Sequence, residues 1–379
     1  MLKRLTVLLL WIPLSVNAQN FSSPHYPQHY FRDPLNIPII LAGNYGELRP
    51  NHFHSGIDIK TGGHENEHVY AAADGYISRI SISNGGFGNA IYITHPNGLT
   101  TLYGHLNRFF PKLEQYVKQH QYEVQKWDVD FNIPPGKFPV KQGDFIAWSG
   151  STGASLAPHL HFEIRDTKSQ KPLNEMLFGF DIKDDIPPAV YRIAIYNRNK
   201  SVYEQTPEIY SVKKINGEWT LASPVIKVAA DKVGFGINTL DHQNGTHNIY
   251  GIYEAALYDD DSPNIGFQLD SIGYDESRYI NAHIDYKTWK DDGHYFEQLF
   301  SLPGNKLNIY HDWDGDGSVD ISDGPVHHIR ITVKDAFKNT TTVKFAVQQA
   351  PDYHPDADTI NYLNRMYPDS KDIFENDRV

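Results

Sequence analysis

The chain has 379 residues, a formal net charge of −12 and no cysteine. This length is sufficient for two domains with separate cores, and the acidic balance argues against nucleic acid as a partner. The lack of cysteine excludes disulfides and thiolate ligands, so any metal site must use histidine and carboxylate side chains.

The first residues predict a secretory signal peptide over residues 1–18. Lys3 and Arg4 give a positive start, residues 5–16 form an apolar run, and Ala18 ends a segment suited to cleavage. This run is short for a membrane span, and an uncleaved anchor is the alternative. We therefore expect an exported protein, periplasmic or secreted, with no transmembrane span in the mature chain. Residues 19–34 are expected to form a polar lead-in segment.

Residues 35–183 are predicted to form an antiparallel β domain. Short apolar runs, such as 69–77 and 90–94, alternate with turns rich in glycine, asparagine and proline. This pattern is typical of antiparallel strands. Residues 111–126 lack the alternation and are predicted to form a helix, within an insertion at about 111–137.

A second β domain is expected over residues 186–349, because the prolines at 187 and 188 end regular structure. Apolar residues alternate with polar ones at 329–333 and again at 343–347, with a turn between them. This predicts a hairpin with one buried face, and we expect an Ig-like β-sandwich. The fold class is therefore mainly β, and residues 350–379 are predicted to be a charged tail.

Histidines in the first domain form a pattern suited to a metal. His159 and His161 alternate with apolar residues, so on a strand they share one face, about 7 Å apart. One imidazole can then bind a metal while the other reaches the metal's water. His54 and Asp58 would lie about 13 Å apart on a straight strand, so the backbone must bend, and Gly56 permits this. Two imidazoles and one carboxylate with an open fourth position are typical of catalytic zinc.

With a third segment, Tyr103-Gly104-His105-Leu106, these motifs resemble the lysostaphin-type, or LytM-domain, zinc endopeptidases. The family pattern is His-x-x-x-Asp, then Tyr-x-His-Leu, then His-x-His, and all three occur here in that order within roughly residues 40–170. The resemblance implies a zinc cofactor and a peptidoglycan peptide as substrate. It implies that the zinc ligands are His54, Asp58 and His161, and that the catalytic histidines are His105 and His159. His159 would be the base and His105 would assist zinc at the oxyanion, a division that the sequence leaves open.

The chain departs from the family pattern in the insertion and at Ala157, where a glycine is common before Pro-His-Leu-His. Neither departure touches a predicted ligand, but the insertion could reshape the substrate groove. Glu163 lies on the same strand face as His161. It could support that ligand or be exposed to solvent.

A second histidine pair lies in His64-Glu65-Asn66-Glu67-His68, which matches the His-Glu-x-x-His motif of a different class of zinc peptidase. That motif requires a helix, so that both histidines share one face. Two glycines precede the segment and a strand-like run follows it. We therefore expect a loop here and no zinc.

Residues 312–323 fit a twelve-residue calcium loop, with oxygen-bearing side chains at the ligand positions and Gly317 at the sharp turn. The last position is aspartate instead of the usual glutamate, which weakens the case for bidentate ligation. The alternative is an acidic surface turn between strands. The candidate ligands of a structural calcium ion are Asp312, Asp314, Asp316, Ser318, Asp320 and Asp323.

These patterns favour a zinc-dependent endopeptidase that hydrolyses peptide bonds in peptidoglycan cross-links or stem peptides. One alternative is a non-catalytic LytM-like regulator or wall-binding protein, which is expected to lose metal ligands that this chain keeps. Another is a β-rich adhesion or carbohydrate-binding protein, which would leave the histidines unexplained.

Overall fold

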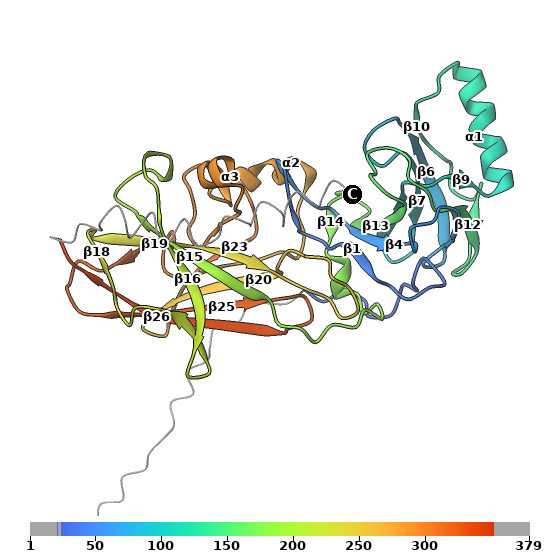
Figure 1. Cartoon of the computed structure of the whole chain (residues 1–379). Helices are drawn as coiled ribbons and strands as arrows, with labels where there is room; N and C mark the ends of the chain where they lie inside the picture. The colour runs from blue at the N-terminus through green and yellow to red at the C-terminus, as the bar shows by residue number, and fades with distance from the viewer. Residues whose placement is uncertain (1–20, 22–23, 352–379) are drawn as a thin grey trace, which may run out of the picture.

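The computed structural model describes residue 21 and residues 24–351. The predicted signal peptide at 1–18 and nearly all of the predicted tail lie outside these residues. Figure 1 shows two β-rich halves side by side. The first half comprises residues 24–183 and the second half residues 186–349. The mainly β fold class is confirmed, and none of the described helices has the length and apolar character needed to span a bilayer.

The first half is built on one antiparallel sheet. Its strands in spatial order are β1 (Leu41–Gly43), β4 (Ile57–Lys60), β13 (His159–Asp166), β8 (Leu99–Gly104), β7 (Asn89–Thr94), β6 (Gly75–Ile82) and β10 (Val129–Asn132). At its margins, β11 (Pro139–Val140) pairs with β6 and β14 (Pro172–Leu173) with β13. Within this sheet, β13 lies between β4 and β8 and pairs with both.

Smaller elements flank this sheet. A second sheet has the order β5 (His68–Tyr70), β12 (Phe145–Trp148), β9 (Arg108–Phe109), and a hairpin joins β2 (Leu48–Arg49) to β3 (His52–Phe53). The predicted inserted helix is confirmed as α1 (Pro111–Val124). Proline at its first turn suits a helix start, and Leu113 and Val117 form its buried face. A 3-10 turn, η1 (Glu175–Leu177), ends this half.

The second half forms one continuous sheet that is mostly antiparallel. Its strands in spatial order are β22 (Glu297–Gln298), β19 (Lys232–Leu240), β15 (Ala189–Asn197), β16 (Glu208–Ile215), β17 (Glu218–Leu221), β26 (Thr340–Gln349), β25 (His327–Lys334), β20 (Glu254–Asp259), β21 (Ser262–Gln268) and β23 (Tyr310–Asp312). The added strands are β18 (Ile226–Val228) on β26 and β24 (Val319–Asp320) on β19. The short helices are η2 (Val202–Glu204), α2 (Tyr274–Ser277), η3 (Arg278–Ala282) and α3 (Tyr286–Asp292). The predicted hairpin is confirmed as β25 paired with β26, while the Ig-like assignment stays a prediction.

Each half has its own large apolar core, but the division does not follow the chain strictly. Tyr45 and Phe53, both 2% exposed, come from the first half and pack in the core of the second. The loop and hairpin at residues 44–53 therefore lie in the seam between the halves. This matters because the next residue, His54, is a predicted metal ligand.

Candidate metal centre

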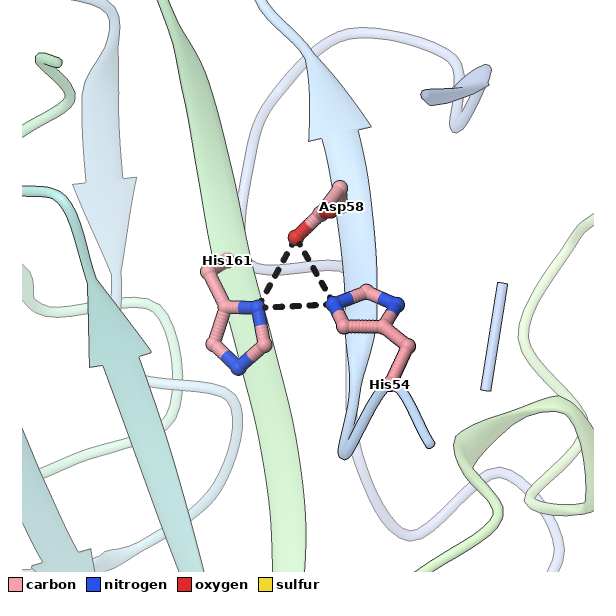
Figure 2. Close-up of side chains that lie close together, drawn as sticks. All are labelled: His54, Asp58 and His161. Atoms are coloured by element: carbon pink, nitrogen blue, oxygen red, sulfur yellow. Dashed lines mark hydrogen bonds and ion pairs between the residues drawn. The ribbon is translucent and has the colours of Figure 1, made fainter. Parts of the chain in front are cut away.

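Two imidazoles and one carboxylate meet beside β4 and β13. His161 lies opposite Asp58 in the antiparallel pairing of these strands, and His54 lies in the loop between β3 and β4. His161 Nδ1 is 2.8 Å from Asp58 Oδ1 and 3.1 Å from His54 Nε2, which is itself 3.2 Å from Asp58 Oδ1. Figure 2 shows the three side chains pointing toward one another. The three predicted ligands are thus neighbours, although His161 lies more than a hundred residues from the other two.

The bend expected between His54 and Asp58 is present, since residues 54–56 separate β3 from β4. Gly56 has a second reason to be glycine. A Cβ atom at this position would lie 2.4 Å from the carbonyl oxygen of Phe162 on β13. Glycine therefore allows the ligand-bearing loop to approach the strand that carries His161.

The spacing of the three atoms fits one small cation. Tetrahedral zinc with bonds of about 2.0–2.1 Å holds its ligand atoms about 3.3 Å apart. The separations of 2.8, 3.1 and 3.2 Å are close to that value. His54, Asp58 and His161 are all buried, at 3–5% exposure. This is a site that a cation could occupy without a change in the backbone.

Hydrogen bonds on the far side of each ring determine which nitrogen faces the cluster. His54 Nδ1 donates to the carbonyl oxygen of Asn44 at 2.8 Å, and His161 Nε2 donates to Glu163 Oε1 at 2.9 Å. In the neutral rings, the other nitrogens carry lone pairs. Two lone pairs and a carboxylate oxygen therefore point at one another. Such a group requires a proton or a metal ion between its members.

The electrostatics agree with that requirement. Burial, with the nearby Arg49 charge, lowers the pKa of His54 to about 4, so this ring is neutral. Burial also lowers the pKa of His161, but hydrogen bonds and charge from Asp58 and Glu163 outweigh it and raise the pKa to about 9. Burial raises the pKa of Asp58, yet the surrounding histidines hold it well below its usual range. The metal-free cluster therefore keeps one proton on His161, which a metal ion must displace.

Buried polar groups behind the ligands fix their positions. Glu163 is fully buried, so the exposed alternative is wrong, and its Oε1 also accepts a hydrogen bond from Ser55 Oγ at 2.8 Å. Arg165 Nε donates to Glu163 Oε2 at 2.6 Å, and Arg49 Nη2 donates to Asp58 Oδ2 at 2.8 Å. A carboxylate that orients a ligand histidine is common in zinc sites. Neither arginine could be predicted as a partner of these carboxylates, because only its charge is visible in the sequence.

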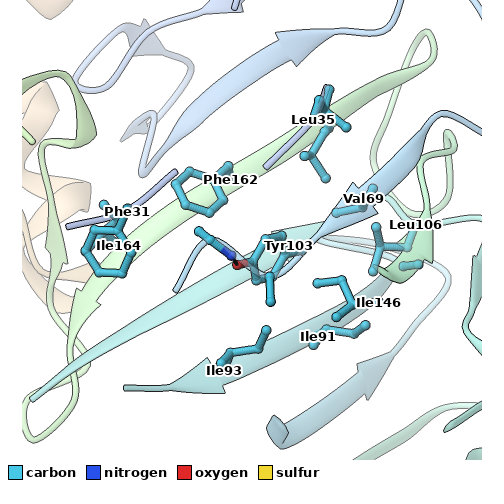
Figure 3. Packing of buried hydrophobic residues seen from close by; sticks show 14 of the residues in the cluster. Phe31, Leu35, Val69, Ile91, Ile93, Tyr103, Leu106, Ile146, Phe162 and Ile164 are labelled. Atoms are coloured by element: carbon cyan, nitrogen blue, oxygen red, sulfur yellow. Dashed lines mark hydrogen bonds between the residues drawn. The ribbon is translucent and has the colours of Figure 1, made fainter. Parts of the chain in front are cut away.

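The strand β13 separates this polar side from an apolar core. Leu160, Phe162 and Ile164 alternate with the polar residues and are fully buried. Figure 3 shows Phe162 and Ile164 packed with Phe31, Tyr103 and neighbouring residues. The predicted alternation thus gives β13 an apolar face that packs in the core. This packing holds the strand, and His161 on its other face, in place.

The two predicted catalytic histidines lie beside the cluster. His105 follows β8 with φ of 57°, a conformation that few non-glycine residues adopt, and its ring centroid is 4.7 Å from that of His159. His159 Nε2 is 3.4 Å from Asp58 Oδ1. Nδ1 of His105 donates to the carbonyl oxygen of Thr152 at 2.7 Å, and Nδ1 of His159 donates to that of Ala157 at 2.8 Å. Both rings therefore present Nε2 as an acceptor.

The surroundings of these two rings differ. Burial and the neighbouring histidines lower the pKa of His105 to about 3, so its ring stays neutral. The His159 side chain is 15% exposed, against 3% for His54 and 4% for His161. His159 therefore faces the open side of the cluster, next to the exposed Leu156 and Ala157.

The second histidine pair does not form a metal site. Residues 61–67 are a loop, as expected, and His68 begins β5. His64 and His68 are both exposed, and no helix places them on a common face. Neither residue belongs to any group of three metal-ligating side chains in the described part of the chain.

The structure does not support the predicted calcium loop at Asp312, Asp314, Asp316, Ser318, Asp320 and Asp323. Three of its five aspartates have other partners. Asp316 accepts a hydrogen bond from the backbone of Ser318 at 3.0 Å and pairs with Arg198 at 3.3 Å. Asp323 pairs with His327 at 3.0 Å. None of these aspartates belongs to a three-residue ligand group in the described residues, so the segment is an acidic turn between β23 and β24.

Two other groups of potential ligands occur in the described residues, both made largely of carboxylates. They are Asp259, Asp260 and His327, and Asp184, Asp241 and Asp335. Among these three groups of described residues, only the cluster of His54, Asp58 and His161 combines two imidazoles with a carboxylate.

Comparison with known proteins supports the resemblance. Residues 52–122 match Peptidase family M23, and this segment includes His54, Asp58 and His105. The DD-carboxypeptidase/endopeptidase Mpg of Neisseria meningitidis is 37% identical over 112 residues, which are 30% of this chain and 20% of that protein. Lysostaphin of Staphylococcus simulans is 34% identical over 96 residues, which are 25% of this chain and 15% of that protein.

These matches are confined to part of each protein. The chain spans about a fifth of the length of the Neisseria relative. Among solved structures, the catalytic domain of lysostaphin from S. simulans is 28% identical, with 36% of this chain and 90% of that domain covered and a TM-score of 0.27. The match to the family model, at residues 52–122, lies within the first half.

Proposed function

We propose that this chain is a zinc-dependent endopeptidase that hydrolyses peptide bonds in bacterial peptidoglycan, with His54, Asp58 and His161 as its zinc ligands. The observation that carries the proposal is the convergence of two imidazole lone pairs and a carboxylate oxygen within 3.2 Å of one another. The match to a peptidase family and the endopeptidases among the relatives support the reaction class.

The donor set suits zinc better than a hard cation. Calcium and magnesium prefer sites made of oxygen atoms, whereas two of the three donors here are imidazole nitrogens. Three protein ligands leave one position open, as in catalytic zinc sites. When bound, zinc supplies Lewis-acid chemistry, which polarises a carbonyl group and makes water more acidic.

His159 is the proposed general base. Its Nδ1 hydrogen is held by the carbonyl oxygen of Ala157, so Nε2 is available to accept a proton from the attacking water. Its partial exposure places this nitrogen where a substrate can approach. After accepting the proton, the same nitrogen can donate it to the leaving amine.

His105 is the proposed partner at the oxyanion. With its hydrogen on Nδ1 and a pKa of about 3, the resting ring cannot donate from Nε2. It could donate to the oxyanion only after taking up a proton from solvent, which the negative charge on the oxyanion would favour.

Peptidoglycan as the substrate agrees with an exported protein, which we propose acts in the periplasm or outside the cell. The experiment is digestion of purified peptidoglycan, with mass spectrometry of the fragments and metal analysis of each protein. We expect His54→Ala to lose cleavage and zinc, and His159→Ala to lose cleavage but keep zinc. His64→Ala, in the exposed loop, should keep both. Cleavage that persists in His54→Ala and His159→Ala would overturn the proposal.

A further inference from the structure

The position of His54 depends on contacts with the second half. Its backbone N–H donates to the carbonyl oxygen of Glu47 at 2.9 Å, and its carbonyl oxygen accepts from Gly46 at 2.9 Å. The preceding residue, Phe53, is buried in the core of the second half, and its N–H donates to Ser277 Oγ at 2.9 Å. Both sides of the backbone at His54 are thus held in the seam between the halves.

The ring of His54 is held in the same way. Its Nδ1 donates to the carbonyl oxygen of Asn44. The Asn44 side chain, in turn, makes two hydrogen bonds to the backbone of Gly251, donating to its oxygen at 2.8 Å and accepting from its nitrogen at 3.0 Å. A Cβ atom on Gly251 would lie 2.9 Å from the Cα of Glu47, so the two backbones are in direct contact. A segment of the second half therefore fixes the residue that orients the first ligand ring.

The second histidine ligand, His161, is also held through a contact with the second half. The Tyr274 hydroxyl, from α2 of the second half, donates to Glu163 Oε1 at 2.8 Å, the oxygen that accepts from His161. Arg165 Nη2 donates to the same hydroxyl at 2.7 Å. Tyr274 is 48% exposed, so much of its contribution comes from the hydroxyl group and little from apolar burial. Tyr274 therefore completes the set of donors around the carboxylate that orients His161.

We propose that the second half is a structural part of the metal centre, in which Tyr274 is a positioning residue for His161, and Gly251 and Ser277 position the segment that carries His54. The proposal rests on the proposed function for the identity of the metal as zinc. Groups that orient metal ligands typically contribute about 10- to 100-fold to metal affinity. Because hydrogen bonds from the second half reach the partners of both histidines, ligand geometry depends on how the two halves pack.

The test is the zinc dissociation constant of the full-length protein, measured by competition with a chromophoric chelator. Tyr274→Phe removes one hydroxyl and leaves the ring in place. Tyr250→Phe is the matched control, because its hydroxyl also joins the halves, donating to the carbonyl oxygen of Leu41 at 2.8 Å, but contacts no ligand or ligand partner. Glu163→Gln, which changes the direct partner of His161, is the positive control.

We expect Tyr274→Phe to weaken zinc binding about tenfold, and Glu163→Gln to weaken it by at least as much. Tyr250→Phe should bind zinc within about twofold of the wild type, even if its melting temperature falls. The visible spectrum of the cobalt-substituted protein should change in Tyr274→Phe and stay the same in Tyr250→Phe, since it reports ligand geometry directly.

The outcomes separate this inference from the proposed function. A wild-type protein that binds no zinc would contradict the proposed function itself. A wild type that binds zinc, with Tyr274→Phe unchanged in affinity and in cobalt spectrum, would overturn only the positioning role. Equal losses of affinity in Tyr274→Phe and Tyr250→Phe would also overturn it, because the effect would then reflect general packing of the halves.

Discussion

The histidine cluster and residues 312–323 both carry a metal-binding pattern in their sequence, and of these two only the cluster gathers its ligands. His54, Asp58 and His161 come from separate segments and meet within 3.2 Å, because the pairing of β4 with β13 places Asp58 opposite His161. The aspartates of residues 312–323 are close in sequence, but Asp316 and Asp323 contact local donors or basic side chains instead of one another. The register of the sheet brings the ligands together, and a hydrogen bond on the far side of each histidine ring fixes its orientation. For forming a metal site, these two features matter more than the spacing of ligand residues along the sequence.

The largest difference between the histidine cluster and residues 312–323 is expected when one carboxylate is removed from each. Structural zinc sites bind with about 10–16 kcal/mol, so one ligand of three or four contributes about 3–4 kcal/mol. We expect Asp58→Asn to weaken zinc binding by two to three orders of magnitude, as measured by chelator competition. Asp316→Asn should leave zinc affinity unchanged, and added calcium should raise the melting temperature of neither protein.

A clear calcium-dependent rise in melting temperature that is lost in Asp316→Asn would show that residues 312–323 do bind calcium. Zinc affinity that survives in Asp58→Asn would remove Asp58 from the ligand set.

A change of pH provides the next largest effect, and it should change the zinc affinity of the histidine cluster. Because the pKa of His161 is about 9 in the metal-free protein, zinc must displace a proton below that pH. Zinc affinity should therefore rise about tenfold per pH unit between pH 6.5 and 9 and then level off. The same raised pKa stabilises the metal-free fold below pH 6.5, and this contribution is lost as the pH rises through 9.

Opposite trends are therefore expected over this range, with zinc affinity rising and metal-free melting temperature falling. Calorimetry in buffers of different ionisation enthalpy counts the released proton. Zinc binding that releases no proton at pH 7 would show that His161 is not a ligand in the form described here.

Much of the histidine site could be predicted because its information is local. Alternation at 159–163 predicts a strand with two faces, and the break at Gly56 predicts the bend before Asp58. The helix predicted at 111–126 is observed at 111–124, and the lack of strand alternation in this segment was the signal for it. These features depend on neighbours in sequence, so the sequence contains their signal.

The residues that hydrogen-bond to the metal ligands, or to the partners of those ligands, could not be predicted, because they depend on contacts between distant segments. Arg49 reaches Asp58 only through the fold of the hairpin β2–β3, and Tyr274 reaches Glu163 across the seam of the two halves. The failure at residues 312–323 has the same origin. Ligand spacing says nothing about Arg198, which lies more than a hundred residues away and pairs with Asp316.

A smaller effect is expected from packing at the bend. Gly56→Ala would place a methyl group 2.4 Å from the carbonyl oxygen of Phe162, so the loop or β13 must shift. We expect a loss of about 2–3 kcal/mol in the free energy of unfolding, together with weaker zinc binding. Gly85→Ala is the control, because nothing lies within 4 Å of the added methyl group. Equal stability of the two variants, measured by denaturant unfolding, would show that the close approach at Gly56 is not needed.

The central claim is that three side chains from separate segments bind one zinc ion, and anomalous diffraction at the zinc absorption edge tests it most directly. Crystals of the purified full-length protein should give a single strong peak among His54 Nε2, Asp58 Oδ1 and His161 Nδ1. A peak at His64 and His68, or zinc-loaded crystals without a peak between the three side chains, would contradict the account.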